Sequence, residues 1–264
     1  MKRERLAQIY DYIENHENVS TLELTAAFQV SEMTIRRDLA ALEKQGKISR
    51  FHGGASVRQS EKSEAAFELR IGVNYECKAA IGRHGVEYLQ TRICSNHPNS
   101  IFLGSGSTIY CMAKQMSPGL SVPIITDNLY ISTILAASDK NTVIMVGGQL
   151  ILPSLNATGY IAEKMISDFT IDCAFISSSA IDENGNLYAY NLLEAGVFST
   201  VISSSKHVVV LADHTKLGKK NLVHVSALNQ HFTLITDSHT PEEYLSYYRN
   251  LGTEVIVVSN PETM

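Results

Sequence analysis

Two adjacent arginines, Arg36 and Arg37, stand near the start of a short helical pattern that opens at Ser31. A guanidinium group pairs with phosphate oxygens and with guanine edges, so arginines on an exposed helix face are suited to DNA recognition. A basic strand and the turn Gly53-Gly54 follow this helix. The layout is typical of a recognition helix with a wing behind it, although winged helices also serve protein contacts and dimerisation.

The residues expected to contact DNA lie on this helix and wing. The helix residues are predicted to approach bases and phosphates in the major groove, and the wing to touch the backbone or minor groove. The predicted set is Ser31, Thr34, Arg36, Arg37, Lys44, Lys47, Arg50 and His52. Residues 31–58 hold six basic and three acidic residues in a chain of net charge −5. This small local excess predicts weak binding by one copy, so a homodimer or homotetramer on double-stranded operator DNA is expected.

A second group of small, polar or charged residues follows the ends of five apolar runs. In open α/β sheets, ligands bind beyond the carboxyl ends of the strands. The run from Gly104 to Thr108 offers backbone amides at the start of a helix, which is a cradle for phosphate. The predicted ligand-binding residues from these strand ends are Gly104, Ser105, Gly106, Ser107, Thr108, Asp127, Asn128, Gly147, Gly148, Ser178, Asp213, His214 and Lys216. Together they suit a small, polyhydroxylated and phosphorylated ligand.

Each of these features also has a plainer interpretation. The 104–108 run could be an ordinary strand-to-helix turn, Gly147-Gly148 a tight turn, and the serines at 177–179 a helix cap. Asp213 and Lys216 could form a surface ion pair. Cys94 and His97 have the spacing of metal ligands, but no second pair stands nearby, so the sequence predicts no metal and no cofactor.

Hydrophobic periodicity predicts two domains. Helices are expected at 3–15, from a capping box at Ser20 through Phe28, and from Ser31 with Met33, Ile35, Leu39 and Leu42 inward. A strand at 47–51 completes a winged helix-turn-helix over residues 1–56, and residues 57–77 are expected to be a linker.

From residue 78 the pattern changes to short apolar runs alternating with helical stretches. Strands are expected at 101–103, 122–126, 142–146, 173–177, 207–212, 233–236 and 254–259, and helices at 108–116, 129–137, 159–167, 191–203 and 241–250. Residues 78–264 are therefore predicted to form an α/β domain with a mostly parallel sheet covered on both faces.

These residues together resemble the DeoR family of bacterial regulators of sugar catabolism, over almost the whole chain. Residues 30–55 look like the family's helix-turn-helix and wing nearly residue for residue, and 105–108 resembles its phosphate loop. The resemblance implies a repressor of a carbohydrate-utilisation operon, a second domain similar in fold to ribose-5-phosphate isomerase, and a phosphorylated sugar or related metabolite as effector. It adds Lys78 and Glu194 to the expected effector-binding residues.

The sequence departs from the family pattern at three places near the expected site. Gly104 stands where the family usually has an acidic residue, Ile109 where it has threonine, and Phe198 where it has lysine.

Two other functions compete with a regulator that is not an enzyme. A sugar-phosphate isomerase with an added N-terminal module would use Asp213, His214 and Lys216, and an oligomerisation adaptor would bind no sugar phosphate. The charged N-terminus lacks the apolar segment of a signal peptide and no run approaches a membrane span, so a cytoplasmic protein without membrane contact is expected.

Overall fold

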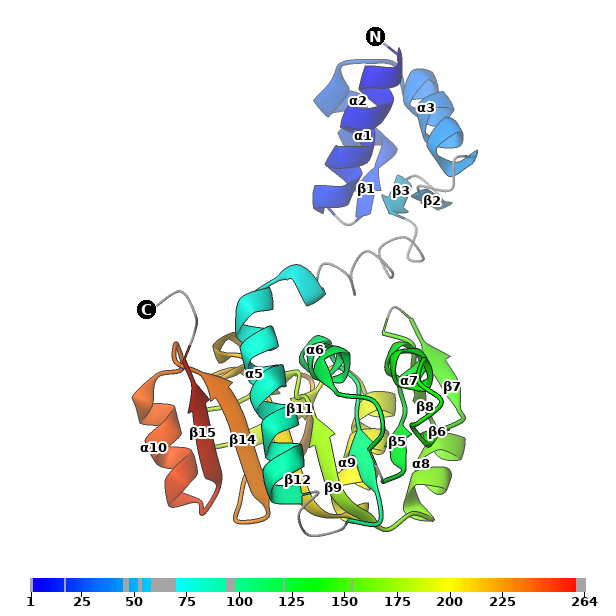
Figure 1. Ribbon diagram of the computed structural model, residues 1–264. Coiled ribbons are helices and arrows are strands. Elements are labelled where there is room, and N and C mark those ends of the chain that lie inside the picture. Colours follow the sequence, from blue (N-terminus) through cyan, green and yellow to red (C-terminus); the bar gives the residue numbers. More distant parts are fainter. Residues whose placement is uncertain are drawn as a thin grey trace. The chain divides into compact units, whose positions relative to one another are not determined.

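The computed structural model describes residues 2–16, 18–44, 48–51, 54–57, 70–93, 98–120, 122–152 and 154–259 (Figure 1). The chain divides into two compact units, Met1–Glu68 and Leu69–Met264. Most of the expected linker, residues 58–69, lies outside the described residues. None of the described helices is long and apolar enough to cross a membrane.

The described residues of the first unit form a winged helix-turn-helix with three helices and three short strands. Its elements are α1 (Lys2–His16), β1 (Asn18–Ser20), α2 (Thr21–Phe28), α3 (Glu32–Lys44), β2 (Ile48–Phe51) and β3 (Gly54–Val57). The strands form an antiparallel sheet in the order β1-β3-β2. The capping box that opens α2 is confirmed, because Ser20 and Glu23 each accept a hydrogen bond from the other's backbone amide.

The buried face of α3 corrects one detail of the sequence analysis. Ile35, Asp38, Leu39 and Leu42 are buried at helical spacing, whereas Met33 is 73% exposed. The predicted inward position of Met33 is wrong, because a residue two positions before Ile35 lies about 200° around the helix from it. Strand β1 was not predicted either, since three residues are too few to show an alternating pattern.

The second unit is built on a seven-stranded parallel sheet, and all seven predicted strands are present in it. The strands are β4 (Ile101–Leu103), β5 (Ile124–Thr126), β6 (Val143–Met145), β9 (Ile171–Ile176), β12 (Ser205–Leu211), β14 (Phe232–Asp237) and β15 (Glu254–Val258). Their order is β15-β14-β12-β9-β4-β5-β6, and every neighbouring pair is parallel.

Helices cover both faces of this sheet and create two hydrophobic cores (Figure 1). On one face, α5 (Tyr75–Tyr88), α6 (Ser107–Gln115) and α7 (Leu129–Ala136) pack on residues such as Ile101 and Leu103. On the other, α8 (Tyr160–Ser167), α9 (Leu192–Ser204) and α10 (Glu242–Asn250) pack on residues such as Phe102. Burial of alternate strand residues on opposite faces explains why the strands are continuously apolar.

The expected domain boundary at Lys78 falls inside a helix. Helix α5 begins at Tyr75, after Asn74 in the left-handed conformation (φ 54°), and the π-helix η1 (Leu89–Ile93) continues it. The mixed composition of residues 75–77 shows no helical periodicity, so the first turn of α5 was assigned to the linker. Cys77 is nevertheless buried in the second unit.

Two small sheets and a helical turn were not predicted. They are the hairpin of β7 (Gln149–Ile151) and β8 (Asn156–Thr158), the sheet of β10 (Ala180–Ile181), β11 (Asn186–Ala189) and β13 (Val223–Ala227), and the 3-10 turn η3 (His214–Lys216). These pieces matter because they supply much of the wall of the cleft described next.

Candidate effector cleft and DNA-binding surface

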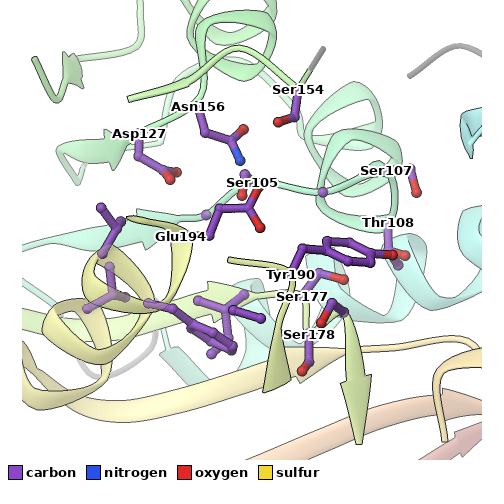
Figure 2. A pocket seen from close by; sticks show the side chains of 18 of the residues that line it. Ser105, Ser107, Thr108, Asp127, Ser154, Asn156, Ser177, Ser178, Tyr190 and Glu194 are labelled. Carbon is purple, nitrogen blue, oxygen red and sulfur yellow. The ribbon is translucent and has the colours of Figure 1, made fainter. Parts of the chain in front are cut away.

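A cleft of about 900 Å³, including its space open to solvent, lies at the carboxyl ends of β4, β5 and β9 and is lined by both polar and apolar side chains. Figure 2 shows side chains from several elements that turn toward it, among them Ser105, Asp127, Asn156 and Glu194. This is the edge at which open parallel sheets bind ligands. The location predicted from the strand ends therefore holds a real cavity.

The loop from Gly104 to Thr108 forms one wall of the cleft. The Gly104 amide donates to the Phe175 carbonyl (2.8 Å), which fixes the loop against β9. Gly106 has φ 123°, and a Cβ there would lie 2.9 Å from the Cβ of Ser177, so glycine is required. Helix α6 begins at Ser107, and the amides of its first turn have no intrahelical acceptor. The loop can therefore receive an anion.

Two carboxyl groups with raised pKa values line the same cleft. Asp127 is 4% exposed, and its Oδ1 atom accepts no hydrogen bond from any described residue. Burial, with a smaller contribution from Glu194, raises the Asp127 pKa to about 7. Burial also raises the pKa of Glu194, and the charge of Arg70 opposes that change. Both groups would gain from a ligand that donates hydroxyl hydrogen bonds.

Arg70 and Lys216 are the basic residues among the described residues that line the cleft. Arg70 lies in a short helical turn at the start of the second unit, and Lys216 ends η3. Phe198, which replaces the family's lysine, lines the cleft as an apolar surface. Arg70 and Lys216 are therefore the positive charges that the described part of the cleft offers to an anion.

Nine of the predicted effector-binding residues line the cleft, and six do not. Those that line it are Gly104, Ser105, Gly106, Ser107, Thr108, Asp127, Ser178, Glu194 and Lys216. Those that do not are Lys78, Asn128, Gly147, Gly148, Asp213 and His214.

Asn128 supports the cleft without lining it. Its side chain caps α7 by accepting from the Ile131 amide (3.0 Å). Its amide group donates to the Ser154 carbonyl (2.6 Å) and to Asn156 Oδ1 (2.8 Å). Since Ser154 and Asn156 line the cleft, Asn128 fixes their positions from behind.

Gly147 and Gly148 lie in the connection between β6 and β7, where the chain bends at Gly148. Gly148 has φ 153°, and a Cβ there would lie 2.7 Å from the Thr158 carbonyl oxygen. The close approach brings the β7–β8 hairpin, which carries Asn156, to the cleft.

Lys78 and Asp213 are buried side chains with structural partners. The Lys78 amine donates to the carbonyls of Arg70 and Val73, and burial lowers its pKa while the Asp213 charge opposes the change. Asp213 caps η3 by accepting from the Thr215 amide (3.0 Å). Asp213 and Lys216 do not form the surface ion pair considered as an alternative, because Asp213 is 1% exposed.

His214 contacts a different group of residues. Its Nδ1 atom lies 2.9 Å from Asp237 Oδ1, and its ring centroid is 5.0 Å from that of His239. The three groups expected for an isomerase, at positions 213, 214 and 216, therefore do not converge on the cleft.

Sequence reasoning missed several residues that line the cleft. They are Arg70, Ser154, Asn156, Thr158, Tyr188 and Tyr190. The missed residues lie in the expected linker or in the two unpredicted small sheets and their loops, where no pattern links them to the site. Ser177 and Ser179, which also line the cleft, belong to the run of serines that the sequence analysis placed at a strand end.

The exposed face of α3 carries the predicted DNA-contacting residues. Arg36 pairs with Glu32 one turn earlier (2.7 Å), and both side chains are exposed. Arg37 and Lys44 are also exposed. At the helix start, the hydroxyls of Ser31 and Thr34 lie 2.9 Å apart.

On the buried face, Arg5 of α1 donates to Asp38 (2.7 Å) and joins the two helices. In the wing, Arg50 lies 3.6 Å from Glu43, while Lys47 and His52 are outside the described residues. Helix α3 and strand β2 therefore present exposed cations, of which Arg36 on α3 and Arg50 on β2 are paired with a neighbouring acid.

Each of the two units matches a known domain family. Residues 5–61 match the DeoR-like helix-turn-helix domain, and residues 73–238 match the DeoR C terminal sensor domain. The chain is 31% identical to the uncharacterized HTH-type transcriptional regulator YulB of Bacillus subtilis, over 89% of this chain and 88% of that protein. It is 27% identical to the glycerol-3-phosphate regulon repressor of Escherichia coli, over 88% of this chain and 90% of that protein.

Ribose 5-phosphate isomerase A from Methanocaldococcus jannaschii matches with a TM-score of 0.37 and 18% identity over 55% of each chain.

A winged helix-turn-helix followed by an α/β sensor unit defines a transcription regulator of two functional parts. With both domain matches and the relatives above, the chain belongs to the DeoR family of transcriptional regulators. The family expectation from the sequence is confirmed.

Proposed function

We propose that this protein represses a carbohydrate-utilisation operon and that a phosphorylated sugar bound in the cleft controls its affinity for operator DNA. The observation that carries the proposal is the cleft itself. It combines an anion cradle at the start of α6 with the buried, unsatisfied Asp127. The E. coli relative that represses the glycerol-3-phosphate regulon supports a phosphorylated effector.

The two ends of such an effector have different partners in the cleft. The phosphate binds the 104–108 loop, with Arg70 and Lys216 as counter-charges. The sugar hydroxyls donate to Asp127 and Glu194 and pair with Asn156, which Asn128 holds in place. Phosphate and hydroxyl contacts together select a sugar phosphate over a free sugar or an inorganic ion.

Arg70 offers a route from the cleft to the DNA-binding unit. It lines the cleft, and it lies close in sequence to the end of the first unit at Glu68. The buried Lys78 amine binds the Arg70 carbonyl and anchors this turn to α5. An effector phosphate that draws Arg70 toward the cleft would move the start of the chain segment that leads to the helix-turn-helix. The phosphate–Arg70 contact would then be present in one conformation and absent in the other, as allosteric control requires.

The operator is bound by α3 and the wing of at least two subunits. The proposed contacts are those of the sequence analysis: Thr34, Arg36 and Arg37 in the major groove, with Ser31 at the helix start, Lys44 at its end, and Lys47, Arg50 and His52 from the wing. A repressor acting on bacterial operator DNA works in the cytoplasm.

Exposed apolar side chains support assembly of the second unit into a dimer or tetramer. They lie on β7, its following loop, α8 and α9, and they are Leu150, Leu152, Tyr160, Ile161, Leu192 and Leu193. These elements contact one another directly or through β8. Sedimentation should give a dimer or larger species, and Leu192→Glu, which places a charge on this surface, should shift it toward monomer.

A thermal-shift screen tests the effector. The purified full-length chain is heated with a panel of pentose, hexose and triose phosphates and with the matching unphosphorylated compounds. A true effector at 100 times its Kd should add about 2.7 kcal/mol of stability. It should also change affinity for a duplex that the protein has selected from a random pool. No stabilisation by any sugar phosphate would leave the adaptor alternative standing.

Substitution of the α3 arginines tests the DNA assignment separately. Arg36→Ala with Arg37→Ala should lower affinity for the selected duplex. The slope of affinity against salt should fall by about 0.9 for each phosphate that the protein no longer neutralises. Arg83→Ala, an exposed arginine on α5, is the matched control. Unchanged binding by the double variant would refute the recognition-helix assignment.

The isomerase alternative makes a different prediction from the same protein. It requires turnover of a pentose or hexose phosphate, and residues 213 and 214 do not line the cleft. We expect the sugar phosphates that stabilise the protein to be recovered unchanged after incubation. Isomerised product that disappears with Lys216→Ala would favour the enzyme.

A further inference from the structure

Four side chains of metal-ligating type meet at one end of the second unit, outside the effector cleft. They come from α5 (Cys77), η3 (His214), the end of β14 (Asp237) and the turn that follows it (His239). Each contributes one potential ligand atom, and all these atoms lie within 4.8 Å of one another.

The spacing of these atoms agrees with tetrahedral coordination. A tetrahedral ion with bonds of roughly 2.0–2.3 Å keeps its ligand atoms roughly 3.3–3.8 Å apart. The Asp237 Oδ1 atom lies 2.9 Å from His214 Nδ1 and 3.0 Å from His239 Nδ1. These two distances lie slightly below the tetrahedral range, and the 4.8 Å upper limit lies about 1 Å above it, so side-chain shifts of up to about 1 Å would bring the four atoms around one ion.

The backbone already holds the central carboxylate in position. Asp237 is fully buried, and it accepts hydrogen bonds from the backbone amides of His214 (2.8 Å) and His239 (3.0 Å). Its orientation is therefore set by main-chain contacts that remain when an ion takes the place of the two imidazole hydrogen bonds. Cys77 lies in the first turn of the 14-residue helix α5, where the helix N-terminus favours a thiolate.

An ion can also reach these side chains from solvent. A surface depression opens onto the cluster, and the residues that line it are Gly72, Asn74, Tyr75, Glu76, Cys77, His214 and His239. The His239 side chain is 51% exposed, which leaves one side of the cluster open. Zn²⁺ prefers this mixture of one thiolate, two imidazoles and one carboxylate, whereas Mg²⁺ and Ca²⁺ prefer oxygen ligands alone.

We propose that Cys77, His214, Asp237 and His239 form a zinc site that fastens the start of α5 to the carboxyl end of β14. On binding, each imidazole gives the Nδ1 lone pair to the ion and keeps its ring proton on Nε2, and the thiol releases its proton to solvent. With four protein ligands the site is structural, not catalytic. The inference stands apart from the effector cleft, because none of the four residues lines it.

The alternative is a metal-free cluster in which Asp237 accepts hydrogen bonds from both histidines. The two arrangements differ in whether the Cys77 sulfur is bonded to an ion. A sulfur-to-metal charge-transfer band appears only if Cys77 binds the ion.

The experiment uses the full-length chain, stripped with a chelator under reducing conditions and titrated with Co²⁺ and then Zn²⁺. We expect one Co²⁺ per chain, a thiolate charge-transfer band, visible bands of tetrahedral intensity, and displacement of both by Zn²⁺. Zn²⁺ should raise the melting temperature. Cys77→Ser should abolish the charge-transfer band, and His239→Gln should weaken Zn²⁺ by at least the roughly 10–100-fold that loss of an outer-shell partner costs.

His231→Gln is the matched control, since His231 is exposed and outside the cluster, and it should bind like the parent chain. If Cys77→Ser fails to fold, the half-exposed His239 still tests the site. The proposal is overturned if the parent chain shows no charge-transfer band with Co²⁺, or if His239→Gln and the parent bind Zn²⁺ equally.

Discussion

The exposed face of α3 and the effector cleft differ in the burial and the pairing of their charged side chains. On α3, Arg36 and Glu32 are both exposed and paired (2.7 Å), an arrangement worth at most about 1 kcal/mol. In the cleft, Asp127 is buried, and its Oδ1 atom has no hydrogen-bond partner among the described residues. The exposed Arg36 can leave Glu32 for a DNA phosphate at little cost in free energy. The buried Asp127 Oδ1 atom instead lacks a hydrogen bond that a ligand can supply.

Because of this difference, substitutions in the two regions should change different measured quantities. Substitutions of buried polar groups in and behind the cleft should change the free energy of unfolding strongly, because such groups are expensive to leave unpaired. Substitutions on the exposed face of α3 should change DNA affinity and leave stability nearly constant.

Asp127→Asn should give the largest effect, and it should be stabilising. The Asp127 pKa is raised to about 7 from an ordinary 3.8, so the folded state holds its proton more tightly than the unfolded chain. The stability that this proton contributes is complete below pH about 4 and is lost as pH rises through 7, by up to about 4 kcal/mol. The variant cannot ionise and should escape this loss.

Urea unfolding of both proteins at pH 5, 6, 7 and 8 measures the predicted difference, which should grow with pH. Asp139→Asn, an exposed acid, is the control and should show no such trend. The variant should at the same time bind the effector more weakly. A stability difference that shrinks as pH rises would mean that Asp127 is held charged by a partner.

Asn128→Ala should be the most destabilising change near the cleft. It removes the cap of α7 and leaves the Ser154 carbonyl and Asn156 Oδ1 without their donor. The expected cost is about 2–4 kcal/mol. Asn191→Ala removes a cap of the same kind from α9 and should cost about 1 kcal/mol. Equal costs for the two variants would show that the buried contacts of Asn128 contribute nothing.

Arg70→Ala should affect effector binding more than stability. Loss of a charge-assisted contact costs about 1.5–3 kcal/mol, which is roughly a 10–100-fold rise in the effector Kd. DNA affinity without effector should stay unchanged, and Arg83→Ala should alter neither quantity. Titration calorimetry with the effector found by the screen gives the Kd, and an unaltered value would remove Arg70 from the phosphate site.

The sequence predicts the seven-stranded sheet well because its strands are buried on both faces and are therefore apolar throughout. It predicts the 104–108 loop and Asp127 because they directly follow such strands. Asn156 was missed because β8 has only three residues and no alternation, and Arg70 because it stands in a polar stretch. The Cys77–His239 cluster was missed because its members are spread over more than half the chain with no characteristic spacing.

Glu32→Gln should have the smallest effect on stability and a distinct effect on DNA binding. The exposed pair with Arg36 contributes little, so the free energy of unfolding should change by less than about 0.5 kcal/mol. DNA affinity should rise severalfold, because the substitution removes a negative charge from the recognition surface and releases Arg36 for a phosphate. Glu242→Gln, which breaks an exposed pair with Arg249 in the second unit (2.6 Å), is the matched control and should leave DNA affinity unchanged. Weaker DNA binding by Glu32→Gln would mean that Glu32 holds Arg36 in its binding geometry, and the α3 surface would then be preorganised in the way the cleft is.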